Sequence, residues 1–489
     1  MKTIFATFLI LLLLLPVPAI GEIQTITHTV KQPFGGSQSP DDARIAAVAK
    51  AKREALEMAG VYVEALTIVK DRKVEKDEIL ALTAGVLNAE VVSQKNYVDG
   101  DAFGLDIIVK VKVDTSLLEE RVKKLLQDNI HISQLKQAQL REKELLDKVA
   151  KLEKENQLLL QKGQDGEKLK VQFQEVSQGL SANELYFKAL ALMDDGKCRH
   201  NSRQIIEYLN QAIRLQPDFA EAYVLRGNAY QGCDFISSSS VSGMAMEDYA
   251  QAIRIKPDLP QAYYFRGFAY VKLERYQQAD EDFNEAIRLM PELSGHIPTY
   301  YIRGLIYCAL AKFQQAIGEL NQLIRLQPDS GIGYYLRGTA YYYGLSKYQL
   351  AILDFNQAIR LQPDLVQPDL VQAYLAQAYL VRGLAYNELG QYKLAVKDFS
   401  QYIRKKSDDP DAYFNRGYAY GNLKQYKLAI VDFNKAIQLK PDFSKAYNNR
   451  GINYMILKNR NEACRSFQLA CELGTCEGYG VAKNKGYCR

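Results

Sequence analysis

Residues 260–291 read PQAYYFRGFAYVKLERYQQADEDFNEAIRLMP, and this stretch is one copy of a unit that recurs to the end of the chain. Counted from Gly267, the unit has fixed residues at positions −4, +3, +12, +16, +19 and +24, namely Tyr263, Tyr270, Ala279, Phe283, Ala286 and Pro291. The same spacing recurs around Gly417 and Gly451, which are 34 residues apart. A period of this length predicts a stack of two-helix units.

The fixed positions have a physical explanation. Large residues between Ala262 and Leu273 recur at steps of three and four, so the first helix buries one stripe. Gly267 has no Cβ and lets a neighbouring helix approach closely, while Tyr270 and Phe283 fill the volume between the two helices. Pro291 ends the second helix because it lacks an amide donor. One helix pair cannot bury its apolar face alone, so the sequence predicts an α-solenoid.

The pattern resembles the tetratricopeptide repeat, with an aromatic, Gly, Tyr, Ala, Phe, Ala and Pro in order. The usual first Trp is replaced, and the chain contains no Trp. The resemblance covers residues 181–476 and gives about eight repeats, the first with Ala189 in the glycine column. The glycine column holds Gly227, Gly267, Gly304, Gly338, Gly383, Gly417 and Gly451. The resemblance implies a scaffold for protein interactions and leaves the partner open.

The start of the chain is typical of an exported protein. Lys2 precedes the apolar run 4–15, and Ala19-Ile20-Gly21 is a small-x-small cleavage site. We expect residues 1–21 to be a signal peptide cleaved near Gly21, which would leave a periplasmic or secreted chain without a transmembrane segment. The alternative is an uncleaved anchor helix. The net charge of +5 and 24% charged residues argue against a dedicated nucleic-acid or membrane-surface protein.

Residues 22–115 are predicted to form a small α+β domain. Ile23–Phe34 alternates like a strand, and Ser39-Pro40-Asp41-Asp42 starts a long Ala-rich helix. A second helix follows, and Asp99-Gly100-Asp101 predicts a hairpin between two further strands. The Ala-rich helix 43–60 and the hairpin resemble the N-terminal domain of flagellar assembly protein T and related exported lipoprotein-type domains. The alternative is a packing domain without a known partner.

Residues 116–180 are predicted to form a helical stalk. Leu145, Val149, Leu152, Asn156 and Leu159 step by four and three, which is a coiled-coil seam. Asn156 falls at an inner position, where an amide disfavours misregistered pairing. We expect a homo-oligomer through residues 116–160, and the alternative is a single solvated helix acting as a spacer.

Catalytic, metal and cofactor sites find no support in the sequence. The four histidines lie in different segments, and no phosphate-binding glycine loop, HExxH or nucleophile elbow occurs. A recurring Arg before the glycine and a recurring acid in the second helix could form an anion-binding ladder. Their parallel recurrence favours ion pairs that hold the helices in register. We expect no enzyme and no cofactor.

The resemblance also predicts a binding groove. In this family the first helices line the concave face, usually with the residues three before, one after and four after the glycine. Those columns are nearly free of charge and rich in rings, which suits an apolar or extended peptide. The predicted partner groove consists of Tyr264, Phe268, Tyr301, Leu305, Tyr335, Tyr342, Leu380, Leu384, Phe414 and Tyr418. The alternative is that these side chains pack against neighbouring repeats.

Seven cysteines in an exported chain indicate disulfides. Cys198 and Cys233 lie in insertions of adjacent repeats and are expected to pair. Bridges from Cys464 and Cys471 to Cys476 and Cys488 would fasten the tail 477–489 over the last repeat, although zinc could use the same four. Cys308 is expected to be the free thiol.

The sequence therefore predicts a non-enzymatic periplasmic scaffold that binds a partner peptide in an aromatic, uncharged groove. Its layout also resembles periplasmic coordinators of cell-envelope machinery. The alternative function is an assembly component of a flagellar or secretion machine, acting through the N-terminal domain.

Overall fold

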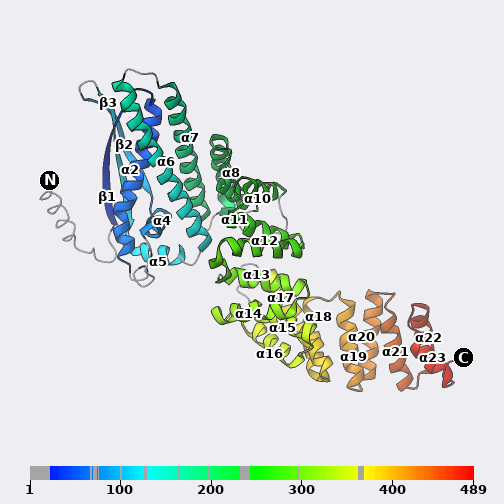
Figure 1. Ribbon diagram of the computed structural model, residues 1–489. Coiled ribbons are helices and arrows are strands. Elements are labelled where there is room, and N and C mark those ends of the chain that lie inside the picture. The colour runs from blue at the N-terminus through cyan, green and yellow to red at the C-terminus, as the bar shows by residue number, and fades with distance from the viewer. Residues whose placement is uncertain are drawn as a thin grey trace. The chain divides into compact units, whose positions relative to one another are not determined.

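In the computed structural model, the described residues are 23–66, 69, 74, 76–99, 102–125, 129–162, 166–194, 198–231, 243–295, 297–361 and 368–488. The chain divides into two compact units, residues 1–293 and 294–489. Figure 1 labels the helices and strands of both units. The predicted signal peptide and the predicted Cys198–Cys233 bridge lie outside the described residues, the latter because Cys233 is not among them.

The first unit begins with a three-stranded antiparallel sheet in the order β1-β3-β2, and this confirms the predicted strand and hairpin. Its strands are β1 (Ile23–Phe34), β2 (Ala89–Asp99) and β3 (Ala102–Asp114). Helix α2 (Pro40–Glu64) packs on one face, where Ala43, Ala47, Ala51, Ala55 and Ala59 are buried at four-residue steps. Methyl side chains let the helix lie close to the sheet.

Helix α2 begins where the sequence predicts. The Ser39 Oγ accepts a hydrogen bond from the Asp42 amide at 3.1 Å and donates one to the Asp42 carboxylate at 2.6 Å. Pro40 occupies the first turn, where its missing donor would have had no partner.

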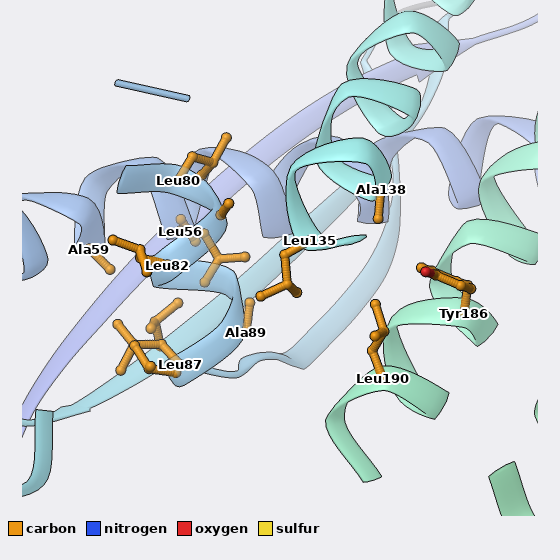
Figure 2. Close-up of a cluster of buried hydrophobic side chains, with 14 of the residues drawn as sticks. Leu56, Ala59, Leu80, Leu82, Leu87, Ala89, Leu135, Ala138, Tyr186 and Leu190 are labelled. Carbon is orange, nitrogen blue, oxygen red and sulfur yellow. The ribbon is translucent and has the colours of Figure 1, made fainter. Parts of the chain in front are cut away.

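Four further helices pack with α2 and the sheet in the N-terminal part of this unit. The elements are α4 (Lys76–Val86), α5 (Thr115–Leu125), α6 (Asn129–Gln161) and α7 (Glu167–Asp194). Figure 2 shows their shared core, in which Leu56, Leu80, Ala89, Leu135 and Tyr186 come from α2, α4, β2, α6 and α7. Residues 116–180 are therefore part of this core and do not form a free stalk.

The predicted coiled-coil seam has its partner within the same chain. Leu145, Val149 and Leu152 of α6 pack with Ala46 of α2 and Phe173 of α7 in one buried cluster. The prediction of a homo-oligomer through residues 116–160 does not fit this packing, because the side chains that would join two copies are already covered.

Asn156 is buried at the inner position of that seam, but its amide recognises a loop. Its Nδ2 donates to the Gly35 carbonyl at 2.8 Å, and its Oδ1 accepts from the Ser37 amide at 3.0 Å. The side chain thus fixes α6 to the turn between β1 and α2.

Helix α7 runs without a break across the predicted border at residues 180 and 181. Its first half packs with α6, and its second half forms the first helix hairpin with α8 (Cys198–Leu215). The other helices of the first unit are α9 (Ala220–Tyr230), α10 (Gly243–Ile255), α11 (Pro260–Lys272) and α12 (Tyr276–Leu289), followed by the 3-10 turn η1 (Pro291–Gly295).

The second unit continues the series of hairpins. Its helices are α13 (Ile297–Ala309), α14 (Phe313–Leu326), α15 (Gly331–Leu345), α16 (Tyr348–Leu361), α17 (Pro368–Glu388), α18 (Tyr392–Lys405), α19 (Pro410–Asn422), α20 (Tyr426–Leu439), α21 (Ser444–Ile456), α22 (Arg460–Glu472) and α23 (Glu477–Asn484). Within the described residues, eight consecutive helix pairs pack as hairpins, from α7–α8 to α21–α22.

The glycine column works as predicted. A Cβ placed on Gly267 would lie 3.0 Å from the ring of Phe283, and one on Gly451 would lie 2.7 Å from Phe467. Both rings are buried between the two helices of their repeat. A larger residue at the glycine would push the helices apart.

Two disulfides fasten the end of the chain. Cys464 pairs with Cys488, with Cα atoms 5.4 Å apart, and Cys471 pairs with Cys476, with Cα atoms 4.0 Å apart. Ala482 of α23 and Cys488 pack on Ala463 and Phe467, so the tail covers the last helix pair.

Candidate interaction surface

The first helices of the second unit lie side by side. Each of α13, α15, α17 and α19 packs against the next first helix in the series, ending at α21. We call the fifteen residues at positions −3, +1 and +4 of their glycines the first-helix surface: Tyr301, Leu305, Cys308, Tyr335, Thr339, Tyr342, Leu380, Leu384, Asn387, Phe414, Tyr418, Gly421, Asn448, Ile452 and Met455. None of them is charged.

The ten predicted groove residues differ in their exposure. Tyr264 and Phe268 of α11 are only 3% and 7% exposed, and both rings pack edge-on against Phe283. These two belong to the core of their repeat and are not available as a surface. Seven others are half-buried, namely Tyr301, Leu305, Tyr335, Tyr342, Leu380, Leu384 and Phe414.

Several half-buried rings pack against the protein's own side chains. The Tyr335 ring lies 5.0 Å from Tyr374 between centroids, and the Phe414 ring lies 5.0 Å from Phe443. Leu380 packs against two buried clusters. These residues link neighbouring repeats, as the alternative interpretation of the columns expects, and they expose only part of their surface.

Tyr418 is the exposed member of the predicted set, with 41% of its surface accessible. Its ring contacts Tyr392 at the start of α18, with centroids 6.3 Å apart. Ile452, one repeat further along in the same column, is 36% exposed. The apolar part of the first-helix surface is therefore most accessible on α19 and α21.

The groups on this surface are neutral. Burial raises the pKa of the Tyr301, Tyr335 and Tyr342 hydroxyls and raises the pKa of the free Cys308 thiol to about 11. A thiol of that pKa is protonated at neutral pH and is a poor nucleophile. At position +4, the Asn387 Nδ2 donates a hydrogen bond to the Asn415 carbonyl at 3.2 Å. The Asn387 Oδ1 is buried and has no hydrogen-bond donor within the described residues.

The recurring arginines form the ion pairs that the sequence predicts, and some of them also contact the preceding repeat, which the sequence analysis did not predict. Arg337 donates Nε and Nη2 to Asp354 of its own repeat at 2.8 and 2.7 Å. Its Nη1 reaches Asn321 of the preceding repeat at 2.7 Å. Arg382 repeats this arrangement with Asp398 and Asn356. Both arginines therefore join the two helices of their repeat to the repeat before it, which favours register over anion binding.

The sequence analysis did not predict that several apolar or aromatic residues are exposed. Tyr343 is 58% exposed, yet it lies one position beyond the columns that we used. On second helices, Leu353 and Val431 are exposed although the residues on both sides of each are buried, and Leu428 is exposed next to the buried Ala429. An apolar residue in a helix looks the same in sequence whether the next helix covers it or not.

The described residues hold no group of three or more His, Cys, Asp or Glu side chains that could bind a metal ion. A search of the described helices for one with the length and apolar character to cross a membrane found none.

Comparisons with known proteins agree with the repeat fold. Family models described as "Tetratricopeptide repeat" match residues 260–293, 303–366 and 410–443, and one described as "TPR repeat" matches residues 383–424. No curated protein matches this chain.

Solved structures with similar helices include YrrB, titled "a TPR protein with an unusual peptide-binding site", at 19% identity and a TM-score of 0.36 over 42% of this chain and 97% of that one. MamA from Desulfovibrio magneticus RS-1 is 22% identical, with a TM-score of 0.33 over 37% of this chain and 96% of that chain. These likenesses concern the fold only. The four family matches, together with the packed helix hairpins, show that residues 260–443 of this chain are built of tetratricopeptide repeats.

Proposed function

We propose that this protein is a non-enzymatic interaction scaffold, which binds an extended, apolar segment of a partner protein on the first-helix surface of residues 294–489. The observation that carries the proposal is the combination of an uncharged surface with the exposed Tyr418 and Ile452. Partners with extended apolar segments suit such a surface because no charged group must lose its hydration on binding.

The neutral side chains of the same surface support an uncharged partner segment. Phenols and a thiol that stay neutral add no charge to the surface. An acidic or basic peptide would gain no ion pair at these positions.

An exported location belongs to the same proposal. Residues 1–21 have the composition of a signal peptide, and two disulfides near the C-terminus suit an oxidising compartment such as the periplasm. Cell fractionation tests it: the mature protein should be found in the periplasmic fraction with a new N-terminus near residue 22. A cytoplasmic protein that retains Lys2 would contradict the location.

Paired variants test the binding surface. Tyr418→Ser with Ile452→Ser should lower capture of periplasmic partners by about tenfold, since both side chains are exposed and their loss leaves the core intact. Leu428→Ser with Val431→Ser is the matched control, because these residues of α20 are also exposed and apolar but lie outside the first-helix surface. Equal capture by both variants would rule out the proposed surface.

The alternative function is assembly through the N-terminal domain. It must be tested with point variants and not with a deletion of this domain. Deletion of residues 22–115 would remove β1, α2 and β3 from a core that also includes Leu135 of α6 and Tyr186 of α7. Loss of function after that deletion would follow from misfolding and would not separate the two functions.

A further inference from the structure

The two edges of the sheet differ in how well they are protected. The edge strand β2 carries a register shift between Val91 and Ser93 and the charged residues Glu90, Lys95 and Asp99. Bulges and charges are the devices by which proteins keep an exposed edge from pairing with another strand. The edge at β2 therefore has built-in protection.

The opposite edge, at β1, carries such devices only near the end of the strand, at the exposed Lys31 and Pro33. β1 stays in continuous register with β3 from Ile23↔Asp114 to Phe34↔Phe103. No Asp, Glu, Lys or Arg occurs between Ile23 and Val30, and the outward-facing side chains there include Thr25, Thr27 and Thr29, which are exposed. Among the described elements, β3 and α2 are those that pack closely on β1, and β1 is the edge strand of the described sheet.

A large cleft reaches the later part of β1, at Gln32. It has a volume of about 820 Å³ and is lined by α2, α4 and α6, with Gln32 of β1 as the strand residue. The His28 Nε2 lies 2.7 Å from the Glu54 carboxylate of α2, and Gln32 donates to Glu153 of α6 at 2.9 Å. Side chains of β1 thus reach both helices that form the walls of the cleft.

The cleft is acidic with an apolar border. Its lining contains Glu54, Glu57, Glu64, Asp77, Asp147 and Glu153, against three cations, Lys50, Arg53 and Lys143. Six acids and three bases give a net charge of −3. Arg53 and Glu57 already pair with each other, with the Arg53 Nε 3.1 Å from the Glu57 carboxylate, and the Arg53 Nη1 donates to the Gln139 carbonyl at 3.0 Å. Met58 and Val61, which share the helix face of Glu54, are 48% and 49% exposed.

We propose that the outer edge of β1 accepts an extended segment of a partner protein as a fourth strand, whose lysine or arginine side chains reach into the acidic cleft. The added strand would take its affinity from main-chain hydrogen bonds to β1. Alternate side chains of a strand point to the same face, so every second residue can be basic. This site is formed by residues 23–153 and does not depend on the first-helix surface.

A synthetic peptide of alternating lysine and valine, equal in length to Ile23–Val30, tests the proposal on the full chain. Binding is measured by isothermal titration calorimetry, and amide hydrogen exchange is followed in β1 and β2. We expect slower exchange at alternate amides of residues 23–30 and no change in β2. The same peptide with N-methyl groups at alternate residues keeps its charge but cannot extend the sheet, and it should bind about tenfold more weakly.

Charge reversals test the cleft. Glu64→Lys with Asp147→Lys removes two exposed acids of the lining and should weaken peptide binding by about tenfold or more. Glu155→Lys with Glu175→Lys makes the same change at exposed positions of α6 and α7 outside the lining, and should preserve binding.

Three results would overturn the proposal. Equal binding of the N-methylated peptide would mean attraction by charge without strand addition. Unchanged exchange in residues 23–30 would place the peptide elsewhere. Protection of the β1 amides in the peptide-free chain, together with a dimer in sedimentation, would assign the edge to a second copy of the chain.

Discussion

Arg450 faces Ser466 where the three preceding repeats place an aspartate opposite the arginine, and its Nε donates to the Ser466 Oγ at 3.1 Å. Its Nη1 keeps the link to Asn434 of the repeat before, at 2.8 Å. The last repeat therefore retains the connection to its neighbour and lacks the ion pair between its own two helices.

Ser466→Asp should stabilise the last repeat. An aspartate at this buried position would complete the two-bond pair seen between Arg416 and Asp432, and we expect a gain of about 1–2 kcal/mol in the free energy of unfolding. Urea denaturation measures the change. Asp432→Ser should have the opposite effect, and a less stable Ser466→Asp protein would show that the site cannot accommodate the larger side chain.

The positive φ angles in the turns between the two helices of a repeat lead to a second prediction. Gly390 has a φ of +68°, and the equivalent turn of the next repeat places Lys424 at +62°. Side chains at positive φ cost about 1 kcal/mol or more, so Gly390→Ala should destabilise the protein by about that amount. Lys424→Gly, measured by the same thermal unfolding, should be neutral or stabilising. A harmless Gly390→Ala would contradict the explanation.

Glu142 should make the stability of the first unit depend on pH. Burial raises its pKa to about 7 from an ordinary 4.5, and Arg53, with Nη1 3.8 Å from the carboxylate, opposes this shift only partly. Between pH 4.5 and 7 the folded state holds a proton that the unfolded state has lost, so stability falls as pH rises through this window.

Glu142→Gln should remove that dependence. We expect the variant to gain about 1–3 kcal/mol relative to the natural protein at pH 8, and to gain little at pH 4. Urea denaturation at both pH values gives the comparison. Arg53 keeps Glu57 and Gln139 as partners in the variant. Parallel pH profiles for both proteins would contradict the raised pKa.

Reduction of the disulfides should loosen the end of the second unit. The Cys464–Cys488 bridge closes 24 residues and the Cys471–Cys476 bridge closes five, so loop entropy predicts losses of about 3 and about 2 kcal/mol, respectively. Cys→Ser pairs at each bridge, followed by hydrogen exchange in α22, measure the two effects. A larger loss at the shorter bridge would contradict the entropic account.

Replacement of Asn156 distinguishes its loop contact from a role in oligomerisation. Asn156→Ala removes hydrogen bonds to Gly35 and Ser37, and it should cost about 1–3 kcal/mol because two main-chain groups lose a partner. Sedimentation should give the same mass before and after the change. A shift in oligomeric state would restore the coiled-coil interpretation.

The repeat fold was predictable because its determinants are local. The spacing from Gly267 to Phe283 lies within one hairpin, and the structure places the two residues in contact as the spacing requires. The β-hairpin likewise depends on a short turn. In both cases, sequence distance and spatial distance are nearly the same.

Surfaces and long-range contacts were harder to predict. Their positions relative to the repeat glycines predicted that Tyr264 and Tyr418 both line the partner groove. The structure shows that Tyr264 is buried and Tyr418 exposed. Asn156 was expected to be buried, but its partner is 121 residues away at Gly35. The acidic cleft had no sequence signal, because Gln32, Asp77 and Asp147 meet only when β1, α4 and α6 have folded together.

Helix α7 is continuous and belongs both to the N-terminal domain and to the first repeat, so the two cannot move independently without bending this helix. Phe173 in its first half belongs to the core with α2 and α6, while Ala189 in its second half packs within the hairpin with α8. The module could not be exchanged between proteins at residue 180 without cutting a helix in the middle of two cores. A force applied to the sheet would therefore be transmitted to the first repeat along α7.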